Sequence, residues 1–375
     1  MSASVQTTIY REQPAISLRN SHIELIVVAG GGHIAAIRPA SGGVNALWEP
    51  HWPTLSPSLR NLTDPDVFGD TSEGKLLSSL VGHNLCLDVF GGHSKGEEEV
   101  GMTFHGEAGM VTWECQEHGS EDGTAWFVMT ANLPHTCLEV ERRYTLAADA
   151  RTVQVEETIE NLTGFQRALG RSQHVTVGQD FLSGGCLFSC NADLGHTWPE
   201  AVDDPGTWAV NKAFTWPDIP NEDGTTSDWR LYPRVANNSD LCTLRINPAD
   251  ANGWLVAAQN NHNLALVYTW ERAVFPWLMT WEENYSRLSK PWNGKELTRG
   301  LEFGSYAYAS SRQANVEMGT LLDTPTFEWI DAYEEKTTLF SVSLFDYEGA
   351  LEQAPVLAPD GDALTAAATG WRIEN

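Results

Sequence analysis

The chain has 375 residues, of which 23 are basic and 50 are acidic, so its formal net charge is −27. This acidic excess repels nucleic acid and anionic membrane surfaces, and it argues against a phosphorylated substrate. Hydrophobic residues make up 42% of the chain, enough for a full core. No stretch approaches the roughly 18 consecutive apolar residues of a membrane span.

Residues 1–6 carry no basic segment followed by an apolar one, so no secretory signal is predicted. The six cysteines are scattered, and only Cys186 and Cys190 lie close together. Without a second such pair, their spacing does not match a zinc site. We therefore expect a cytoplasmic protein with reduced thiols in its core.

The first clear signal along the chain is a pair of strands at 23–28 and 33–37, separated by three glycines at 30–32. The glycines resemble a phosphate-binding loop, but no helix-forming stretch follows them, which favours a hairpin turn. Residues 70–85 could hold a short helix.

A second hairpin is predicted at 138–146 and 152–160, where apolar and polar residues alternate on either side of the turn at 147–150. Residues 254–258 and 264–268 suggest another pair of strands.

The stretch 197–240 is rich in Pro, Asp, Asn, Gly and Trp and is predicted to form long loops. No break in composition and no internal repeat divides the chain. We therefore expect one domain over residues 1–375, folded as a large antiparallel β-sandwich, with a loosely packed tail at about 353–375.

Glu302 lies in a strand-like run, 298–304, shortly after the aromatic-rich stretch 275–283. A buried carboxylate is costly unless it is paired or used. Aromatic walls with a few fixed polar groups suit a sugar, because the rings cover its C–H face. The alternative is a strand glutamate facing water beside a structural aromatic cluster. The chain has fifteen tryptophans, and many must be core.

Seven short motifs follow one another along the chain: Gly30–Gly32, Phe104–Gly109 followed by Trp113, Tyr144–Leu146, Glu157–Thr163, Gly170–His174, Phe275–Leu278 followed by Trp281, and Gly300–Glu302. Together they resemble the galactose mutarotase-like (aldose 1-epimerase) superfamily over about residues 20–345. The resemblance implies that superfamily's large β-supersandwich, with Glu302 as catalytic base, His174 as catalytic acid and His105 holding a sugar oxygen.

Such an enzyme opens the hemiacetal ring with one group that takes the anomeric hydroxyl proton and another that protonates the ring oxygen. A carboxylate and an imidazole have ordinary pKa values near 4.3 and 6.5, so they are suited to these roles near neutral pH. The chemistry needs no cofactor. His83, His93 and His105 are too widely spaced for a metal signature, so no metal is expected.

The chain departs from the family pattern at residues 175–178, where a proline and an aromatic residue usually follow the catalytic histidine. His83 and Asn84 stand about where the family has an Asn-Arg pair, and the family's substrate-binding Asp has no clear counterpart. Additional residues proposed to bind substrate are His83, Asn84, Trp277, Trp281 and Arg299. Each could instead be structural.

The leading hypothesis is an aldose 1-epimerase-like isomerase that acts on a small-molecule carbohydrate as a monomer or homodimer, with no nucleic acid or membrane partner. One alternative is a carbohydrate-binding protein on the same fold without turnover. Another is a glycosidase or lyase, which would need a second carboxylate such as Glu282 or Glu283.

Overall fold

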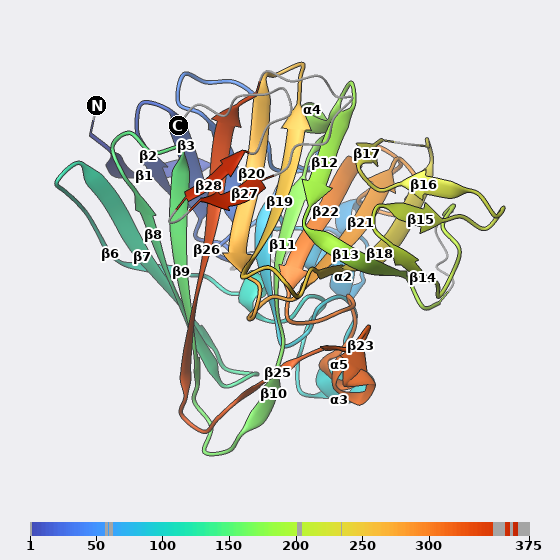
Figure 1. Cartoon of the computed structure of the whole chain (residues 1–375). Coiled ribbons are helices and arrows are strands. Elements are labelled where there is room, and N and C mark those ends of the chain that lie inside the picture. The colour runs from blue at the N-terminus through green and yellow to red at the C-terminus, as the bar shows by residue number, and fades with distance from the viewer. Residues whose placement is uncertain are drawn as a thin grey trace.

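The structure is a computed structural model that describes residues 2–56, 59, 63–200, 205–233 and 235–347, and the backbone of 357–360 and 363–366. Two large antiparallel sheets pack face to face (Figure 1). The predicted all-β antiparallel sandwich is therefore confirmed. The predicted tail at 353–375 lies outside the described residues, apart from the backbone of β27 (Leu357–Asp360) and β28 (Ala363–Ala366).

The first sheet contains, in spatial order, β1 (Ser4–Tyr10), β2 (Gln13–Arg19), β3 (Ile23–Val28), β4 (Ile34–Pro39), β5 (His83–Leu87), β11 (Arg171–Val177), β22 (Leu297–Gly304), β21 (Trp277–Asn284), β18 (Asn238–Ile246), β13 (Ala192–Thr197) and β14 (Ala213–Thr215). Its centre joins strands that are far apart in sequence, since β11 pairs with both β5 and β22.

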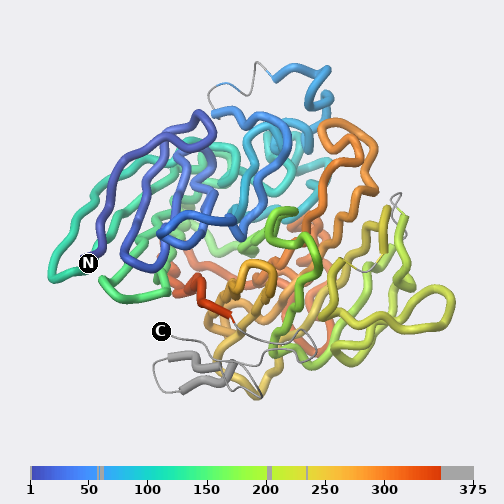
Figure 2. Tube along the Cα trace, turned by 90° about the horizontal axis from the view of Figure 1, so that it is seen from above, coloured from blue at the N-terminus to red at the C-terminus, as the bar shows by residue number. Residues whose placement is uncertain are grey.

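The second sheet contains, in spatial order, β17 (Leu231–Tyr232), β12 (Cys186–Cys190), β19 (Asn252–Gln259), β20 (Leu264–Glu271), β26 (Glu335–Asp346), β9 (Thr152–Asn161), β8 (Leu138–Leu146), β7 (Thr124–Leu133) and β6 (Glu114–Glu121). The edges of the two sheets meet where β1 lies beside β6 and β7 (Figure 2). There the Ala3 amide donates a hydrogen bond to the Gly123 carbonyl at 3.0 Å.

The three hairpins predicted from sequence pattern are all present as β3–β4, β8–β9 and β19–β20. In the first, Gly31 and Gly32 adopt positive φ angles of 74° and 61° in the turn, a conformation that glycine tolerates best. In the second, buried and more exposed residues alternate along both strands, as the apolar–polar pattern requires.

The remaining elements are short. The helices are α1 (Pro65–Phe68), α2 (Ser72–Leu77), α3 (Lys95–Glu99), the 3₁₀ turn η2 (Ala108–Met110), α4 (Gln179–Leu182) and α5 (Arg312–Met318). The small strand pairs are β10 (Arg167–Leu169) with β25 (Glu328–Ile330), β15 (Asp218–Pro220) with β16 (Thr226–Asp228), and β23 (Thr320–Leu321) with β24 (Thr324–Pro325).

Of three further predictions from the sequence, one is confirmed and two need correction. The short helix predicted within 70–85 is α2. The stretch 197–240 was predicted as loops only, yet it contributes β14 to β17 and the start of β18, because its apolar residues, such as Phe214 and Ile219, pack against the core. The thiols Cys115 and Cys137 are exposed, so the expectation that all the cysteines lie in the core was wrong for these two.

The central strands of the first sheet are buried on both faces, which sets the place of the functional site. All residues of β5, β11, β21 and β22 are buried. One face packs on the second sheet through residues such as Val175, Leu301 and Phe303. The other face is covered by α1, α2 and long loops, whose apolar side chains, such as Trp48 and Leu76, form a second cluster with Trp281 of β21.

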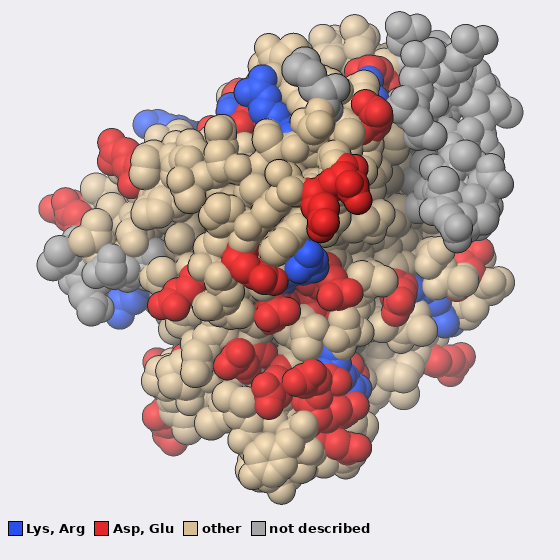
Figure 3. Space-filling view, turned by 90° about the vertical axis from the view of Figure 1, so that its left-hand side faces the viewer, with Lys and Arg blue, Asp and Glu red and all other residues tan. Residues whose placement is uncertain are grey.

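No helix in the described part of the chain is long and apolar enough to cross a membrane. Acidic side chains outnumber basic ones on the face of the molecule shown in Figure 3, in keeping with the net charge of −27.

Candidate functional site

A row of four side chains crosses the centre of the first sheet. His174 on β11 lies directly opposite Asn84 on β5 and Glu302 on β22, and Glu302 lies opposite Met279 on β21. Residues directly opposite in antiparallel strands project to the same face. The strand register therefore brings His174 and Glu302 together although 128 positions separate them in the chain.

His174 and Glu302 contact each other directly. The His174 Nε2 atom lies 3.2 Å from Glu302 Oε1, and both side chains are almost fully buried. Gly300 makes room for this carboxylate, because a Cβ atom at that position would lie only 2.2 Å from Oε1. The other ring nitrogen of His174, Nδ1, lies 3.1 Å from the Thr176 hydroxyl. The carboxylate oxygen Oε2 of Glu302 is buried without a hydrogen-bond partner.

His105 approaches the pair from a tight turn. Its backbone adopts a positive φ of 63°, and Gly106, which follows with φ 81°, leaves no space for a Cβ beside the Leu87 carbonyl. The Gly91 amide donates to His105 Nδ1 at 3.0 Å, and the His105 amide donates to the Gly91 carbonyl at 2.9 Å. Neutral His105 therefore carries its proton on Nε2. Its ring packs edge-on against His174, with centroids 4.9 Å apart.

These three residues share a cavity of about 250 Å³. The remaining lining residues are Trp48, Glu73, Leu76, Leu77, Leu80, Gly91, Gly92, Phe104, Thr176, Trp198, Leu241, Met279, Trp281, Arg287, Trp292 and Ala309. A small pocket with aromatic walls and a few converging polar groups has the character of a small-molecule site.

The more exposed end of the cavity carries an ion pair between Arg287 and Glu73, whose Nη1 and Oε1 atoms lie 3.0 Å apart. The Arg287 guanidinium also lies over the rings of Trp281 and Trp292, at 5.0 and 5.3 Å from their centroids, and 3.6 Å from Glu283. Sequence reasoning missed Arg287 and Glu73, because both lie in segments without a motif.

Burial controls the protonation of the acid–base groups. It raises the pKa of Glu302 well above 4.5 and lowers the pKa of His174 to about 4. Burial also lowers the pKa of His105 well below 6.5, and the nearby His174 and Arg287 act in the same direction. At these buried positions, one dissociable proton is therefore shared along the His174–Glu302 contact, and His105 stays neutral.

Of the residues predicted to bind substrate, His105 and Trp281 line the cavity, whereas His83 and Asn84 do not. His83 projects between the two sheets, where Nε2 contacts Gln173 at 3.0 Å and Nδ1 contacts the Tyr268 hydroxyl at 3.3 Å. Asn84 is on the same face as His174 but does not line the cavity, and its amide donates to Cys86 Sγ at 3.4 Å.

Trp277 and Arg299 also lie outside the cavity. Trp277 is the first residue of β21 and packs on Ala307 and Tyr308. Its indole donates a hydrogen bond to the Pro325 carbonyl at 2.7 Å. Arg299 faces the second sheet, because it is an odd number of residues from Glu302 along β22. Its guanidinium lies over three core aromatic rings and 3.6 Å from Glu282, so this carboxylate faces away from Glu302. Glu283, the other carboxylate considered for a hydrolase, accepts hydrogen bonds from the Ser286 amide and hydroxyl and does not line the cavity.

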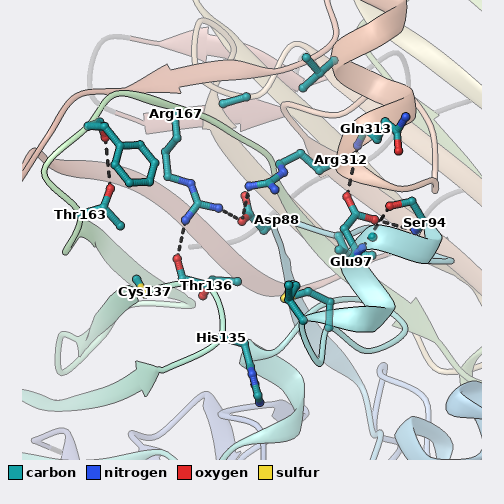
Figure 4. Close-up of a pocket in the computed structure, with 17 residues that line it drawn as sticks. Asp88, Ser94, Glu97, His135, Thr136, Cys137, Thr163, Arg167, Arg312 and Gln313 are labelled. Carbon is teal, nitrogen blue, oxygen red and sulfur yellow. Dashed lines mark hydrogen bonds and ion pairs between the residues drawn. The ribbon is translucent and has the colours of Figure 1, made fainter.

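A larger cavity of about 660 Å³ is lined by residues that include Asp88, Glu97, Arg167 and Arg312 (Figure 4). Its charged groups already have partners: Asp88 pairs with Arg167 and with Arg312, and Glu97 accepts hydrogen bonds from the Ser94 and Gln313 amides. It lacks an acid–base pair of the His174–Glu302 kind. Within the described residues, no group of three or more His, Cys, Asp or Glu side chains is arranged to hold a metal ion.

No protein-family model matches the chain, and no curated protein matches it in sequence. Solved structures do match. A candidate aldose 1-epimerase from Klebsiella pneumoniae superposes with a TM-score of 0.65 at 10% identity, over 92% of this chain and 84% of that chain. A galactose mutarotase-like protein from Clostridium acetobutylicum gives 0.61 at 13% identity, over 92% and 99%.

A galactose mutarotase related enzyme from Lactobacillus acidophilus gives a TM-score of 0.54 at 9% identity, over 88% of this chain and 97% of that chain. The chain therefore has the galactose mutarotase-like fold. At such low identities the likeness concerns the fold, and the chemistry has to be argued from the cavity itself.

Proposed function

We propose that this protein is an isomerase that interconverts the anomers of a monosaccharide by acid–base opening of its hemiacetal ring. The observation that carries the proposal is the His174–Glu302 contact of 3.2 Å, buried in an aromatic-walled cavity. Ring opening needs one proton acceptor and one proton donor close together, and no redox group.

The Glu302 oxygen without a partner, Oε2, is suited to accept the proton of the anomeric hydroxyl. A substrate hydroxyl there would replace hydration that burial removes, and so favour the ionised carboxylate. The shared proton then resides on His174 Nε2, which delivers it to the ring oxygen. After rotation about C1–C2, the same groups act in reverse to close the ring on the other face of the aldehyde.

His105 has a different part in this scheme. Its Nδ1 atom already accepts a hydrogen bond from the Gly91 amide, and burial keeps the ring neutral. A neutral imidazole can donate a hydrogen bond from Nε2 but is far too weak an acid to release that proton. His105 therefore orients a sugar oxygen, and the proton that moves belongs to His174 and Glu302.

The test is an anomerisation assay by polarimetry, or by saturation-transfer NMR, over a panel of free monosaccharides. For at least one sugar, we expect the rate of equilibration between anomers to rise above the rate in buffer in proportion to the protein concentration. His174→Gln and Glu302→Gln should each lose about 10²- to 10⁴-fold, the usual contribution of a positioned acid or base. Glu328→Gln is a matched control, because Glu328 pairs with Arg171 outside the cavity.

Two outcomes would contradict the proposal: no sugar equilibrates faster than in buffer, or both cavity variants keep full activity. Sugar-dependent thermal stabilisation without any anomerisation would instead identify a carbohydrate-binding protein without turnover. Release of sugar from an aryl glycoside would indicate a hydrolase, which needs two carboxylates about 5–10 Å apart.

A further inference from the structure

We infer that the substrate is an uncharged deoxy sugar, a hemiacetal with fewer hydroxyl groups than a hexose. The inference rests on the proposed function and concerns the same cavity. It follows from how polar groups are distributed over the cavity wall, and from the partners that those groups already have.

The polar side chains of the cavity gather at two places. His105, His174, Thr176 and Glu302 form the buried end, where the anomeric carbon and ring oxygen would lie. Arg287 and Glu73 form the more exposed end. The rest of the wall is apolar and is made of Trp48, Leu76, Leu77, Leu80, Phe104, Trp198, Leu241, Met279, Trp281, Trp292 and Ala309.

Most backbone and indole groups of this wall already have partners, and the Trp292 indole, whose buried Nε1 has none, is left as a single hydrogen-bond donor. The Gly91 amide and carbonyl both bond to His105, and the Ala309 amide donates to Met279 Sδ at 3.1 Å. The Trp48 indole donates to Glu296 at 2.7 Å, and the Trp281 indole donates to Ser239 at 3.3 Å. These rings therefore present their apolar faces to the cavity.

The charge at the exposed end is already balanced. Arg287 lies 3.0 Å from Glu73 and 3.6 Å from Glu283, so its guanidinium has two carboxylate neighbours. An anionic sugar would have to compete with both of them. The end of the cavity thus favours a neutral ligand, in line with a net charge of −27.

A pyranose whose C1 and ring oxygen meet His174 and Glu302 directs its C3 and C4 substituents away from them, toward the apolar wall. The Trp292 indole can bond one hydroxyl there, and a second buried hydroxyl has no partner, whereas a methyl or methylene group is favoured. Replacing one such hydroxyl by hydrogen should raise kcat/KM about 10- to 100-fold, the range by which apolar pockets discriminate small groups.

The test compares D-glucose and D-galactose with their C3, C4 and C6 monodeoxy analogues in the anomerisation assay. We expect at least one deoxy analogue of each hexose to exceed its parent about tenfold or more in kcat/KM. Parent hexoses that equal or exceed every deoxy analogue would overturn the inference.

Leu241→Asn provides a second test. Leu241 is half-buried on β18 beside Trp281, and asparagine of similar size adds hydrogen-bonding groups to the wall. The variant should lower the preference for deoxy sugars several-fold, and an unchanged preference would count against the inference. Leu339→Asn, at an exposed position on β26, should leave the preference as in the wild type.

A binding measurement separates this inference from the proposed function. Methyl glycosides of the same sugars cannot open their rings, but their binding should quench tryptophan fluorescence. Deoxy methyl glycosides should bind at least about tenfold more tightly than their parents. If deoxy methyl glycosides bind more tightly but no free sugar is anomerised, the proposed isomerase activity is refuted and the inferred preference for deoxy sugars stands. Equal affinities, or no binding, would refute the ligand class.

Discussion

Thr176 offers a sharp test of the acid–base scheme, because its side chain touches His174, the proposed catalytic acid. Its hydroxyl lies 3.1 Å from His174 Nδ1. When His174 is protonated, Nδ1–H donates to this oxygen, so Thr176 stabilises the imidazolium that the proposed ring opening requires. Thr176→Val keeps the shape and the β-branch of the side chain but removes the acceptor.

The magnitude follows from one lost hydrogen bond, which is worth about 0.5–1.5 kcal/mol. At about 1.36 kcal/mol per tenfold in rate, kcat should fall about 2- to 13-fold. The same loss should lower the pKa of His174 further below its value of about 4, so the acid limb of the rate profile moves to lower pH.

The assay is the pH dependence of anomerisation for wild type, Thr176→Val and Thr176→Ser. Serine keeps the hydroxyl and should restore both the rate and the position of the acid limb. A valine variant with lower activity but an unshifted acid limb would mean that Thr176 acts only through packing. Full activity in the valine variant would refute the assigned contact with the acid.

Three further predictions concern pH and stability. The wild-type rate should rise as pH increases through about 4, where the pair loses its second proton, and should fall only above the raised pKa of Glu302; a maximum rate below pH 4 would contradict this. Between about pH 6.5 and that raised pKa, the folded His174–Glu302 pair holds a proton that neither residue keeps in the unfolded chain, so stability should fall as pH rises. Glu302→Gln should remove this loss. The melting temperature of the variant, relative to that of the wild type, should therefore increase as pH rises across this range. Arg299→Gln should lower the free energy of unfolding by about 3–5 kcal/mol, because Glu282 loses a buried cation. Chemical denaturation measures this loss. A drop in activity per folded molecule would instead indicate that Arg299 contributes to the functional site.

The sequence was most informative about local structure. Alternation along 138–146 and 152–160 predicted β8 and β9 because both strands have one face on the core. The central strands β11 and β22 lack that alternation, since both of their faces are buried. The resemblance to a known family, rather than the pattern of the residues, indicated that His174 and Glu302 belong together.

The residues around the pair were harder to predict, for a physical reason. A shift of one position along a strand moves a side chain to the opposite face, so His83 points into the core while Asn84 is on the same face as His174. Arg287, Trp48 and Leu76 reach the cavity from loops and a short helix, whose approach depends on the tertiary fold. Local sequence does not encode that approach.

The central claim is that His174 and Glu302 act as one acid–base unit on a sugar. The most direct measurement is the rate of anomer exchange, by saturation-transfer NMR, for wild type, His174→Gln, Glu302→Gln and the double variant. Residues that act as a unit are not additive, so the double variant should be no slower than either single variant. Losses that multiply in the double variant, or single variants as fast as the wild type, would contradict the claim.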